Sequence, residues 1–450
     1  MNEHFGAAAQ SALAKLIAAR EAVTGIIGLG YVGLPLSAAC ARAGFPTIGF
    51  DVDENKIVQL NSGQSYIDAV SSADLSEQIG GERFRATADF SELAKCDVVI
   101  ICVPTPLSRY REPDLRYVEA TAETIARNLR SGQLVVLEST TYPGTTEEIV
   151  KPILEGTHLK SGSDFFLGFS PEREDPGNTT FRTTTIPKVV AGDGSAASSL
   201  MEAFYGAVVD RVVVVSSPKV SEAVKITENV FRAVNIALVN ELKMIYDAMG
   251  IDIWEVIDAA STKPFGFMPF YPGPGLGGHC IPIDPFYLTW KSREYGLTTR
   301  FIELAGEINV SMPRYVINKL ENALDRFQQV SLSSSRILIL GLAYKKNVSD
   351  IRESPSFELM EMLEKRGSSV AFHDPHAGTI PMTRDHAAFA GGESVSLNAD
   401  VIQGYNAVVV ATDHDAIDYE LIAANAKLIV DTRNVFARKN IEIRNIMVKA

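Results

Sequence analysis

The feature that most constrains this fold is a glycine-rich turn in the first tenth of the chain. The sequence Gly-Leu-Gly-Tyr-Val-Gly at Gly28–Gly33 follows the apolar run Val23–Ile27 and opens the helical pattern Leu34–Ala43. Asp51 ends the next apolar run, about 20 residues beyond the turn. Such glycines let the backbone approach a pyrophosphate at the positive end of a helix, and the acid reaches a ribose. The pattern therefore predicts a dinucleotide-binding βαβ unit rather than a glycine turn without a ligand.

Asp51 also indicates which dinucleotide binds. Its carboxylate can hold both ribose hydroxyls, whereas it would repel a 2′-phosphate, so we expect NAD rather than NADP. Lys56 lies on the helix after Asp51 and is expected on the adenosine side, with a solvated lysine as the alternative. Thr105 and Thr140 lie just beyond two later strands, at the edge where open sheets bind ligands. Their hydroxyls are expected near the nicotinamide, with plain turns or helix caps as the alternative.

Short apolar runs alternate with helical periodicity in two separate parts of the chain, as in doubly wound α/β folds. In the first part we predict strands at Val23–Ile27, Thr47–Phe50, Val98–Val103, Leu134–Glu138, Phe166–Phe169, Val189–Ala191 and Val212–Val215. In the second part we predict strands at Arg336–Leu340, Ser369–His373, Ala407–Ala411 and Lys427–Val430. The order strand, glycine, helix, strand, acid recurs there from Gly341 to Asp374, without a second G-x-G-x-x-G. We therefore expect an α/β protein with two Rossmann-like domains.

A helical region separates these two parts. A long helix is predicted from Ser217 to about Met249, and shorter helices at Ile253–Ala260 and Pro285–Tyr295. One long helix between two α/β domains is typical of a spacer or a dimer seam, so a homodimer or higher homo-oligomer is expected. The expected domains are a leader helix at 1–22, a NAD-binding domain at 23–216, a central helical domain with a cysteine loop at 217–330 and a second Rossmann-like domain at 331–450.

Charge and hydropathy limit the partners. The net charge of −13 and the lack of a basic run disfavour nucleic acid and anionic membranes. No stretch reaches the roughly 18 apolar residues that a membrane span needs, and the leader lacks a signal-peptide apolar region, so a cytoplasmic protein is expected. The leader instead predicts an amphipathic helix with Leu13, Leu16 and Ile17 on one side.

One of the four cysteines stands apart. Cys40, Cys96 and Cys102 fall in or beside apolar segments and are expected to be buried; their spacing predicts neither a disulfide framework nor a metal site. Cys280 instead lies on a glycine-rich turn, four residues before Asp284. A thiolate there could attack a bound aldehyde, and Asp284 could help deliver water to the resulting thioester. A structural cysteine is the alternative.

Three polar side chains share one face of the long helix. Lys225 and Asn229 are four residues apart, and Glu222 lies about one turn earlier, among apolar positions. Lys225 and Asn229 together are suited to stabilise an alkoxide or a tetrahedral oxyanion. A solvated salt-bridge face is the alternative.

Six separated motifs carry a resemblance to a known family. They are Gly28–Gly33, Ser139-Thr140, Ser170-Pro171-Glu172, Lys225-x-x-x-Asn229, Gly277-Gly278-His279-Cys280-x-Pro282-x-Asp284, and Gly341-Leu342-Ala343-Tyr344-Lys345-Lys346 with Asp350-Ile351-Arg352-Glu353-Ser354. In this order they resemble the UDP-glucose/GDP-mannose dehydrogenase family, over nearly all of the chain from about Val23 onward. The resemblance implies a four-electron oxidation of a nucleotide sugar at C6 with two NAD, and UDP binding by the domain at 331–450.

The resemblance also implies roles for individual residues. The catalytic residues would be Cys280 as nucleophile, Lys225 with Asn229 at the oxyanion and in proton transfer, Asp284 and Thr140 at the hydrolytic water, and Glu172 as a base or at the thioester stage. The cofactor-binding residues would be Gly28, Gly30, Tyr31, Val32, Gly33, Asp51, Lys56, Thr105, Thr140 and Arg352, the last within or across a subunit. The substrate-binding residues would be Glu172, Arg173, Lys225, Asn229, Gly277, Lys345 and Arg433, with Lys345 and Arg433 at the phosphates or the uridine side.

The segment Ser170–Asn178 bears on the sugar. It is similar to the version in family members that act on UDP-N-acetylhexosamines, and His279 before the cysteine agrees. The expected substrate is therefore UDP-N-acetyl-D-glucosamine, for surface polysaccharide precursors, with UDP-glucose, UDP-N-acetylmannosamine and UDP-N-acetylgalactosamine as alternatives. The aromatic segment Pro264–Phe270 could line an apolar pocket for the acetyl methyl, or merely pack a loop.

Two other classes of protein fit parts of the chain. A two-electron hydroxyacid or 6-phosphogluconate-type dehydrogenase has a similar Rossmann domain and helical centre, but needs neither Cys280 nor a second α/β domain. A NAD-bound scaffold or sensor would not need the catalytic residue types. The number of NADH formed per substrate separates the dehydrogenases: two for the six-carbon acid, one for the rival.

We predict a clear preference for NAD over NADP. The Asp51 carboxylate would repel a 2′-phosphate, so kcat/KM with NADP should be at least about tenfold lower. Steady-state rates with each cofactor measure this ratio, and Asp51→Asn is expected to narrow it. Equal activity with both cofactors would contradict the assignment of Asp51 to the ribose.

Overall fold

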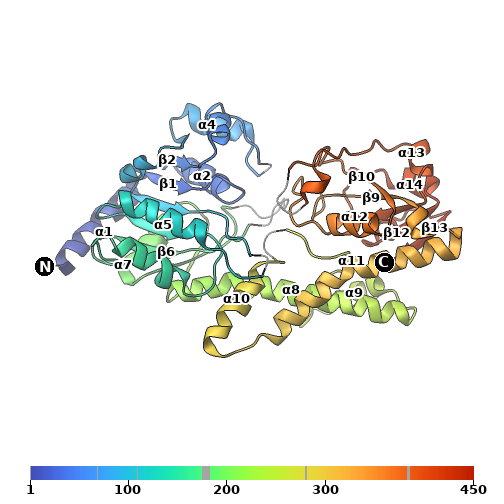
Figure 1. Cartoon of the computed structure of the whole chain (residues 1–450). Helices are drawn as coiled ribbons and strands as arrows, with labels where there is room; N and C mark the ends of the chain where they lie inside the picture. Colours follow the sequence, from blue (N-terminus) through green and yellow to red (C-terminus); the bar gives the residue numbers. More distant parts are fainter. Residues whose placement is uncertain (1, 68, 109, 175–182, 279–280, 383–385) are drawn as a thin grey trace. The chain divides into compact units, whose positions relative to one another are not determined.

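The computed structural model describes residues 2–67, 69–108, 110–174, 183–278, 281–382 and 386–450 (Figure 1). The chain divides into two units, Met1–Glu228 with Phe286–Thr298, and Asn229–Pro285 with Thr299–Ala450. Each unit has its own sheet.

An eight-stranded sheet forms the centre of the first unit, in the order β3-β2-β1-β4-β5-β6-β7-β8. Neighbouring strands are parallel except for β6 and β7, which are antiparallel. The middle strands are apolar and fully buried, as expected where helices cover both faces of a parallel sheet. The strands are β1 Thr24–Ile27, β2 Thr47–Phe50, β3 Phe84–Thr87, β4 Val98–Ile101, β5 Leu134–Leu137, β6 Phe166–Phe169, β7 Lys188–Gly192 and β8 Val212–Val214.

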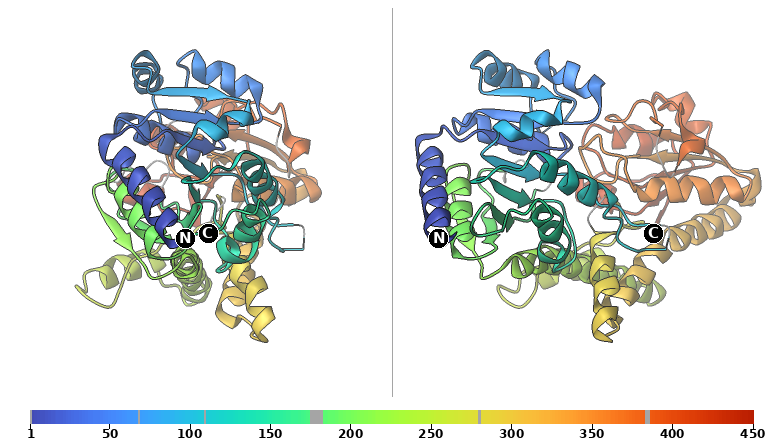
Figure 2. Two further views of the ribbon diagram at one scale, coloured as in Figure 1. Left: turned by 90° about the vertical axis from the view of Figure 1, so that its left-hand side faces the viewer. Right: turned by 60° about the vertical axis from the view of Figure 1, so that its left-hand side comes forward.

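The leader forms part of the first unit's core. Helix α1, Asn2–Ala19, lies against α7, Ser195–Tyr205 (Figure 2). Leu13 and Ile17 are buried in the same apolar cluster as Leu200 and Phe204, which confirms the predicted amphipathic helix. The other helical segments are α2 Gly33–Arg42, α3 Glu54–Asn61, α4 Ser72–Gly80, η1 Phe90–Lys95, α5 Arg116–Asn128, η2 Thr146–Val150, α6 Lys151–Glu155 and η3 Arg293–Tyr295.

A five-stranded, wholly parallel sheet forms the centre of the second unit, in the order β10-β9-β11-β12-β13. Its strands are β9 Arg336–Leu340, β10 Ser369–His373, β11 Ala407–Val410, β12 Leu428–Asp431 and β13 Ile446–Lys449. Its helical segments are α9 Ile253–Ser261, α11 Arg300–Gln328, η4 Leu332–Ser334, α12 Pro355–Lys365, η5 Ala387–Phe389, α13 Ala399–Gln403, α14 Tyr419–Asn425 and α15 Val435–Arg438. Separate apolar clusters pack on the two faces of this sheet.

Two helices contain residues of both units: α8, Pro218–Ala248, and α10, Asp284–Ser292. Within the second unit α8 packs against α11 through a buried amide pair. Asn240 Nδ2 donates to Asn309 Oδ1 at 2.9 Å, and Asn309 Nδ2 donates to the Ala233 carbonyl at 3.1 Å. These bonds satisfy polar groups that would otherwise destabilise the helix contact.

The expected fold class is confirmed: two Rossmann-like sheets and a helical middle with one long helix. The predicted strands agree with the observed ones within two residues at each end. The sequence pattern missed β3, β13 and α11. Proline within a helix removes a hydrogen bond, and α11 runs through Pro313, which is buried. Among the described residues, no helix combines the length and apolarity that crossing a membrane requires.

Truncating the leader's core contact should destabilise the first unit. Ile17→Ala removes a fully buried side chain, so we expect a loss of about 2–5 kcal/mol in the free energy of unfolding. The midpoint of urea unfolding measures it. Leu16→Ala, at a half-buried position of the same helix, is the matched control and should cost less than half as much. Equal effects would mean that α1 does not pack through this face.

Candidate active site

The glycine turn after β1 has the space and shape that a pyrophosphate requires. Gly28 has a left-handed φ of +93°, and a Cβ there would lie 2.5 Å from the Cys102 carbonyl oxygen. A Cβ at Gly33 would lie 1.8 Å from the Gly28 carbonyl oxygen, so the first turn of α2 packs tightly on the strand. A Cβ at Gly30 would meet nothing within 4 Å, which leaves the approach to the N-terminus of α2 open. Tyr31 is exposed at the same turn. These residues fit a dinucleotide.

Asp51 joins the end of β2 to this turn. Its Oδ2 accepts from the Leu29 N–H at 3.0 Å, and its Oδ1 accepts from the Asp53 N–H at 3.0 Å. Lys56 Nζ lies 3.4 Å from Asp51 Oδ2, so this lysine contacts the acid itself. Tyr66 donates to the Leu29 carbonyl at 2.5 Å, and burial with the charges of Asp51 and Asp53 raises its pKa. The acid is thus held rigidly beside the turn, where the sequence predicted the ribose.

The loops after β4 and β5 lie at the carboxyl edge of the sheet, as predicted. Thr105 is half-buried, and its carbonyl accepts from the Tyr287 hydroxyl at 2.6 Å. Ser139 Oγ donates to the Val103 carbonyl at 2.8 Å, which ties the two loops together. Thr140 follows directly and is half-buried.

A buried ion pair beneath this edge was not predicted. Lys188 Nζ lies 2.9 Å from Glu138 Oε2, and the two side chains are 10% and 1% exposed. The Tyr205 hydroxyl donates to the other oxygen of Glu138. Burial and the Glu138 charge raise the pKa of Tyr205. The sequence signal that could have predicted this pair is Lys188 itself, a charged residue at the start of the otherwise apolar strand β7.

The three cysteines of the first unit are buried, as predicted. Burial, with the nearby Asp97 charge, raises the pKa of Cys96 to about 12, and burial also raises the pKa values of Cys40 and Cys102. All three thiols therefore stay protonated and unreactive at neutral pH.

Lys225 and Glu172 form a buried pair in the first unit. Lys225 Nζ donates to the Glu172 carbonyl at 2.6 Å and lies 3.2 Å from Glu172 Oε2. The two side chains are 6% and 12% exposed. Next to them Arg173 pairs with Glu228 through Nη2 at 2.6 Å and Nε at 3.3 Å. The part of the substrate-class segment at 175–178 lies outside the described residues.

Glu222 lies one helical turn before Lys225 and is fully buried. Its carboxylate accepts from the Gly144 N–H at 2.5 Å, from the Thr146 N–H at 2.8 Å and from the Thr146 hydroxyl at 2.7 Å. The solvated-face alternative is wrong, because Glu222, Lys225 and Asn229 are all buried.

In the second unit, Asn229 contacts the acid of the cysteine motif. Its Nδ2 donates to Asp284 Oδ2 at 2.6 Å, and both side chains are buried. Cys280 and His279 lie outside the described residues. The structure thus joins two residues, 55 apart in sequence, that were assigned to one reaction.

The glycines before the cysteine pack on the loop after β9. A Cβ at Gly277 would lie 2.6 Å from the Tyr344 Cβ, and the Gly278 N–H donates to the Arg352 carbonyl at 3.3 Å. A Cβ at Gly273 would lie 2.6 Å from Nη1 of Arg433. A side chain at Gly273 would therefore displace the Arg433 guanidinium, and one at Gly277 would displace Tyr344 and the Glu353 backbone.

The predicted UDP-binding residues lie in the same unit. Lys345 is half-buried in the loop after β9. Arg433 follows β12, and its Nε donates to the Ala411 carbonyl at 2.8 Å. Arg352 is held in a bidentate pair with Asp350 at 2.8 and 2.6 Å. Its contact with the cofactor stays a prediction.

Comparison with known proteins gives one family over most of the chain. Sequence profiles of the UDP-glucose/GDP-mannose dehydrogenase family match residues 22–209 with its NAD binding domain, 219–311 with its central domain and 338–438 with its UDP binding domain. The cofactor is therefore NAD, as the glycine turn and Asp51 predicted.

Individual relatives cover most of the chain. A UDP-N-acetyl-D-glucosamine 6-dehydrogenase of Pseudomonas aeruginosa is 37% identical over 81% of this chain and 88% of its own. A UDP-N-acetyl-D-mannosamine dehydrogenase of Pyrococcus horikoshii is 34% identical over 91% of this chain and 95% of its own. The solved structure of a UDP-glucose dehydrogenase from Pyrobaculum islandicum superimposes with a TM-score of 0.84 at 29% identity, covering 95% of this chain and 96% of its own.

Glu222 should make stability depend on pH. Burial raises its pKa from 4.5 to about 7, although hydrogen bonds from Thr146 and Gly144 act in the opposite direction. The folded state therefore binds this proton more tightly than the unfolded state, so the contribution is complete below pH 4.5 and is lost as the pH rises through about 7. Relative to Glu222→Gln, the protein should lose on the order of 3 kcal/mol across that interval. Denaturant titrations at each pH measure it, and parallel curves for the two proteins would contradict it.

Proposed function

Because the chain belongs to the UDP-glucose/GDP-mannose dehydrogenase family, we propose that it oxidises C6 of UDP-N-acetyl-D-glucosamine to the uronic acid with NAD. The observation that carries the proposal is the pair of buried contacts on α8. Lys225 is bound to Glu172, and Asn229 is bound to Asp284. Four polar side chains assigned to the reaction are thus held inside the protein. The product would serve as a surface polysaccharide precursor.

The choice of sugar rests on two supports. The segment beginning Ser170-Pro171-Glu172-Arg173 is similar to that of enzymes acting on UDP-N-acetylhexosamines, and the relative from Pseudomonas aeruginosa is named for UDP-N-acetyl-D-glucosamine. UDP-N-acetylmannosamine is the first alternative, because the relative from Pyrococcus horikoshii is named for it. UDP-N-acetylgalactosamine and UDP-glucose are further alternatives. Phe265 and Met268, proposed to contact the acetyl methyl, are exposed, whereas Phe270 packs on Phe231.

Each part of the chain has a proposed task. Residues 23–216 hold NAD, with Gly28–Gly33 at the pyrophosphate and Asp51 at the ribose. Residues 217–330 carry the reacting groups. Residues 331–450 hold UDP, with Lys345 and Arg433 as its cationic ligands. In a protein with a net charge of −13, such local cations are needed to attract an anionic substrate.

The reaction removes two electron pairs from C6 and adds one oxygen atom from water. NAD supplies a hydride acceptor for each oxidation. Between the two oxidations the Cys280 thiolate adds to the C6 aldehyde, so a C–S bond forms and the carbonyl oxygen takes the negative charge. Lys225 and Asn229 stabilise that oxygen by donating hydrogen bonds. Covalent capture keeps the reactive aldehyde from leaving.

Loss of the second hydride from C6 would convert this thiohemiacetal to a thioester, and hydrolysis then releases the acid. Water adds to the thioester carbon, the C–S bond breaks, and the water proton passes to the sulfur. Asp284, whose carboxylate is held by Asn229, positions that water together with Thr140. Glu172, held by Lys225, is the proposed base of the thioester stage.

We also propose that two copies of the chain associate through α8. Phe231, Leu238 and Ile245 recur every seven residues on this helix and are 47%, 49% and 47% exposed. A stripe at this spacing is what a second helix packs against. The self-complementary partner is a second copy, related by a two-fold axis.

Replacing the proposed nucleophile should stop acid formation. The protein should form two NADH per UDP-N-acetyl-D-glucosamine, whereas Cys280→Ser should lower uronic acid formation about a thousandfold or more and leave the Kd for NAD unchanged. NADH absorbance and mass spectrometry of the product measure both, and a panel of UDP-sugars identifies the substrate. Cys96→Ala, at a buried cysteine away from these residues, is the control. Normal acid yield from Cys280→Ser would overturn the mechanism.

A further inference from the structure

The two sheets share one structural device at the end of their first strand. Gly28 and Gly341 both have left-handed φ angles, +93° and +82°. A Cβ at either glycine would lie about as close to a carbonyl oxygen of the neighbouring strand's end, at 2.5 and 2.4 Å. Asp51 and Asp374 each accept from the N–H that follows the glycine, at 3.0 and 2.6 Å.

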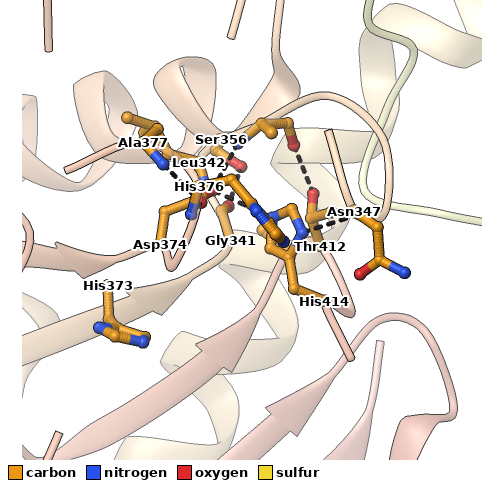
Figure 3. Close-up of polar contacts among 12 residues, drawn as sticks. Gly341, Leu342, Asn347, Ser356, His373, Asp374, His376, Ala377, Thr412 and His414 are labelled. Carbon is orange, nitrogen blue, oxygen red and sulfur yellow. Dashed lines mark hydrogen bonds and ion pairs between the residues drawn. The ribbon is translucent and has the colours of Figure 1, made fainter. Parts of the chain in front are cut away.

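The two acids differ in what else surrounds them. The Asp51 side chain keeps 8% of its surface exposed, whereas that of Asp374 is completely buried. Five donors surround the Asp374 carboxylate (Figure 3): the N–H groups of Leu342, Ala343, His376 and Ala377, and Nε2 of His414. Two carboxylate oxygens have about four acceptor sites, so Asp374 has no capacity left for a ribose. In the second unit the acid therefore holds the surrounding backbone instead of a ligand.

His414 is held at both ring nitrogens. Its Nε2 lies 3.0 Å from Asp374 Oδ2, and its Nδ1 accepts from the Asn347 N–H at 2.9 Å. A backbone N–H can only donate, so Nδ1 carries no proton, and the proton sits on Nε2, facing the carboxylate. The side chain is 0% exposed. These partners select one neutral tautomer and one ring orientation.

These contacts close both ends of one loop. This loop, Leu342–Asn347, contains Lys345. The Leu342 N–H at its start donates to Asp374, and the Asn347 N–H at its end donates to His414. In between, the Thr412 hydroxyl donates to the Ala343 carbonyl at 2.7 Å. At the end of the loop, Asn347 has a left-handed φ of +59°, and two bonds with Asp415 hold it: its Nδ2 donates to Asp415 Oδ2 at 2.7 Å, and its Oδ1 accepts from the Asp415 N–H at 2.9 Å.

We propose that His414 is a positioning residue for UDP. By bridging Asp374 and Asn347, it fixes the backbone of Leu342–Asn347 before the ligand arrives, so that Lys345 meets the diphosphate without an entropic cost of ordering the loop. The inference rests on the proposed contact between Lys345 and UDP. It assigns the buried histidine a function in affinity rather than in the chemical step.

The test is UDP binding by calorimetry, combined with steady-state kinetics. His414→Phe keeps an aromatic ring, somewhat larger than imidazole, but leaves the Asn347 N–H without its acceptor and Asp374 without one of its donors, so the Kd for UDP and the KM for the UDP-sugar should rise about tenfold. The kcat and the KM for NAD should change by less than about twofold. His414→Gln should restore most of the affinity, because the side-chain amide offers both a donor group for Asp374 and an acceptor oxygen for the Asn347 N–H.

A second histidine provides the matched control. His373 lies in the same sheet, with Nδ1 2.7 Å from the Val395 carbonyl, and no dashed line joins its ring to Asp374, His414 or Asn347 in Figure 3. His373→Phe should leave the Kd for UDP within about twofold of the wild-type value. Thermal unfolding of every variant separates a local effect on the loop from a loss of the folded domain.

These measurements test the role of His414 whichever UDP-sugar is the substrate, because UDP itself is the ligand. Wild-type affinity in His414→Phe, or equally weak binding by the Gln and Phe variants, would overturn it. Should His414→Phe fail to fold, Asp415→Ala removes the exposed carboxylate to which Asn347 Nδ2 donates, and about threefold weaker UDP binding is expected. Unchanged binding would then overturn the inference. Lys345→Ala is tested in parallel: unchanged UDP affinity there would remove the proposed ligand role of Lys345 instead.

Discussion

A carboxylate that accepts the N–H after a left-handed glycine holds the functional edge of each sheet. In the first unit this is Asp51 at the turn after β1, and in the second it is Asp374 at the turn after β9. The bond fixes where the strand ends and how the next segment leaves it. Ligands of open α/β sheets bind at that edge, so the contact decides where binding groups can stand. The same contact holds the acid that is proposed to bind a ribose in one unit, and it orders a lysine-bearing loop in the other.

The polar side chains of α8 that were assigned to the reaction are buried, so each needs a partner inside the protein. Charged groups are rarely buried without partners, because removing them from water is costly. On α8, Glu222 is satisfied by two N–H groups and a hydroxyl, Lys225 by Glu172, and Asn229 by Asp284. The partners come from sequence positions 53 to 78 residues away. Each pair therefore also holds a distant segment against the long helix, so stability and positioning of the proposed reacting groups have the same origin.

Most of the fold could be predicted from the sequence, because its strands and helices follow local patterns of apolar residues and glycines. Apolar runs marked the buried parallel strands, and glycine spacing with Asp51 marked the cofactor. The misses have physical reasons. Helix α11 continues through Pro313 because Leu320 and Leu324 pack in the core of the second unit, and this burial compensates for a missing hydrogen bond. The edge strands β3 and β13 are short and only partly buried, so their patterns are weak.

The sequence by itself determined the fold class, the cofactor and the residue types available for chemistry, since each depends on spacing within one βαβ unit or one helix turn. Only the tertiary structure decided which of these residues are paired. Arg173 pairs with Glu228, Glu138 with Lys188, and Asp374 with His414, across 40 to 55 positions of the sequence. No local pattern encodes such pairs, because each depends on how strands and loops distant in sequence come to share one edge of a sheet.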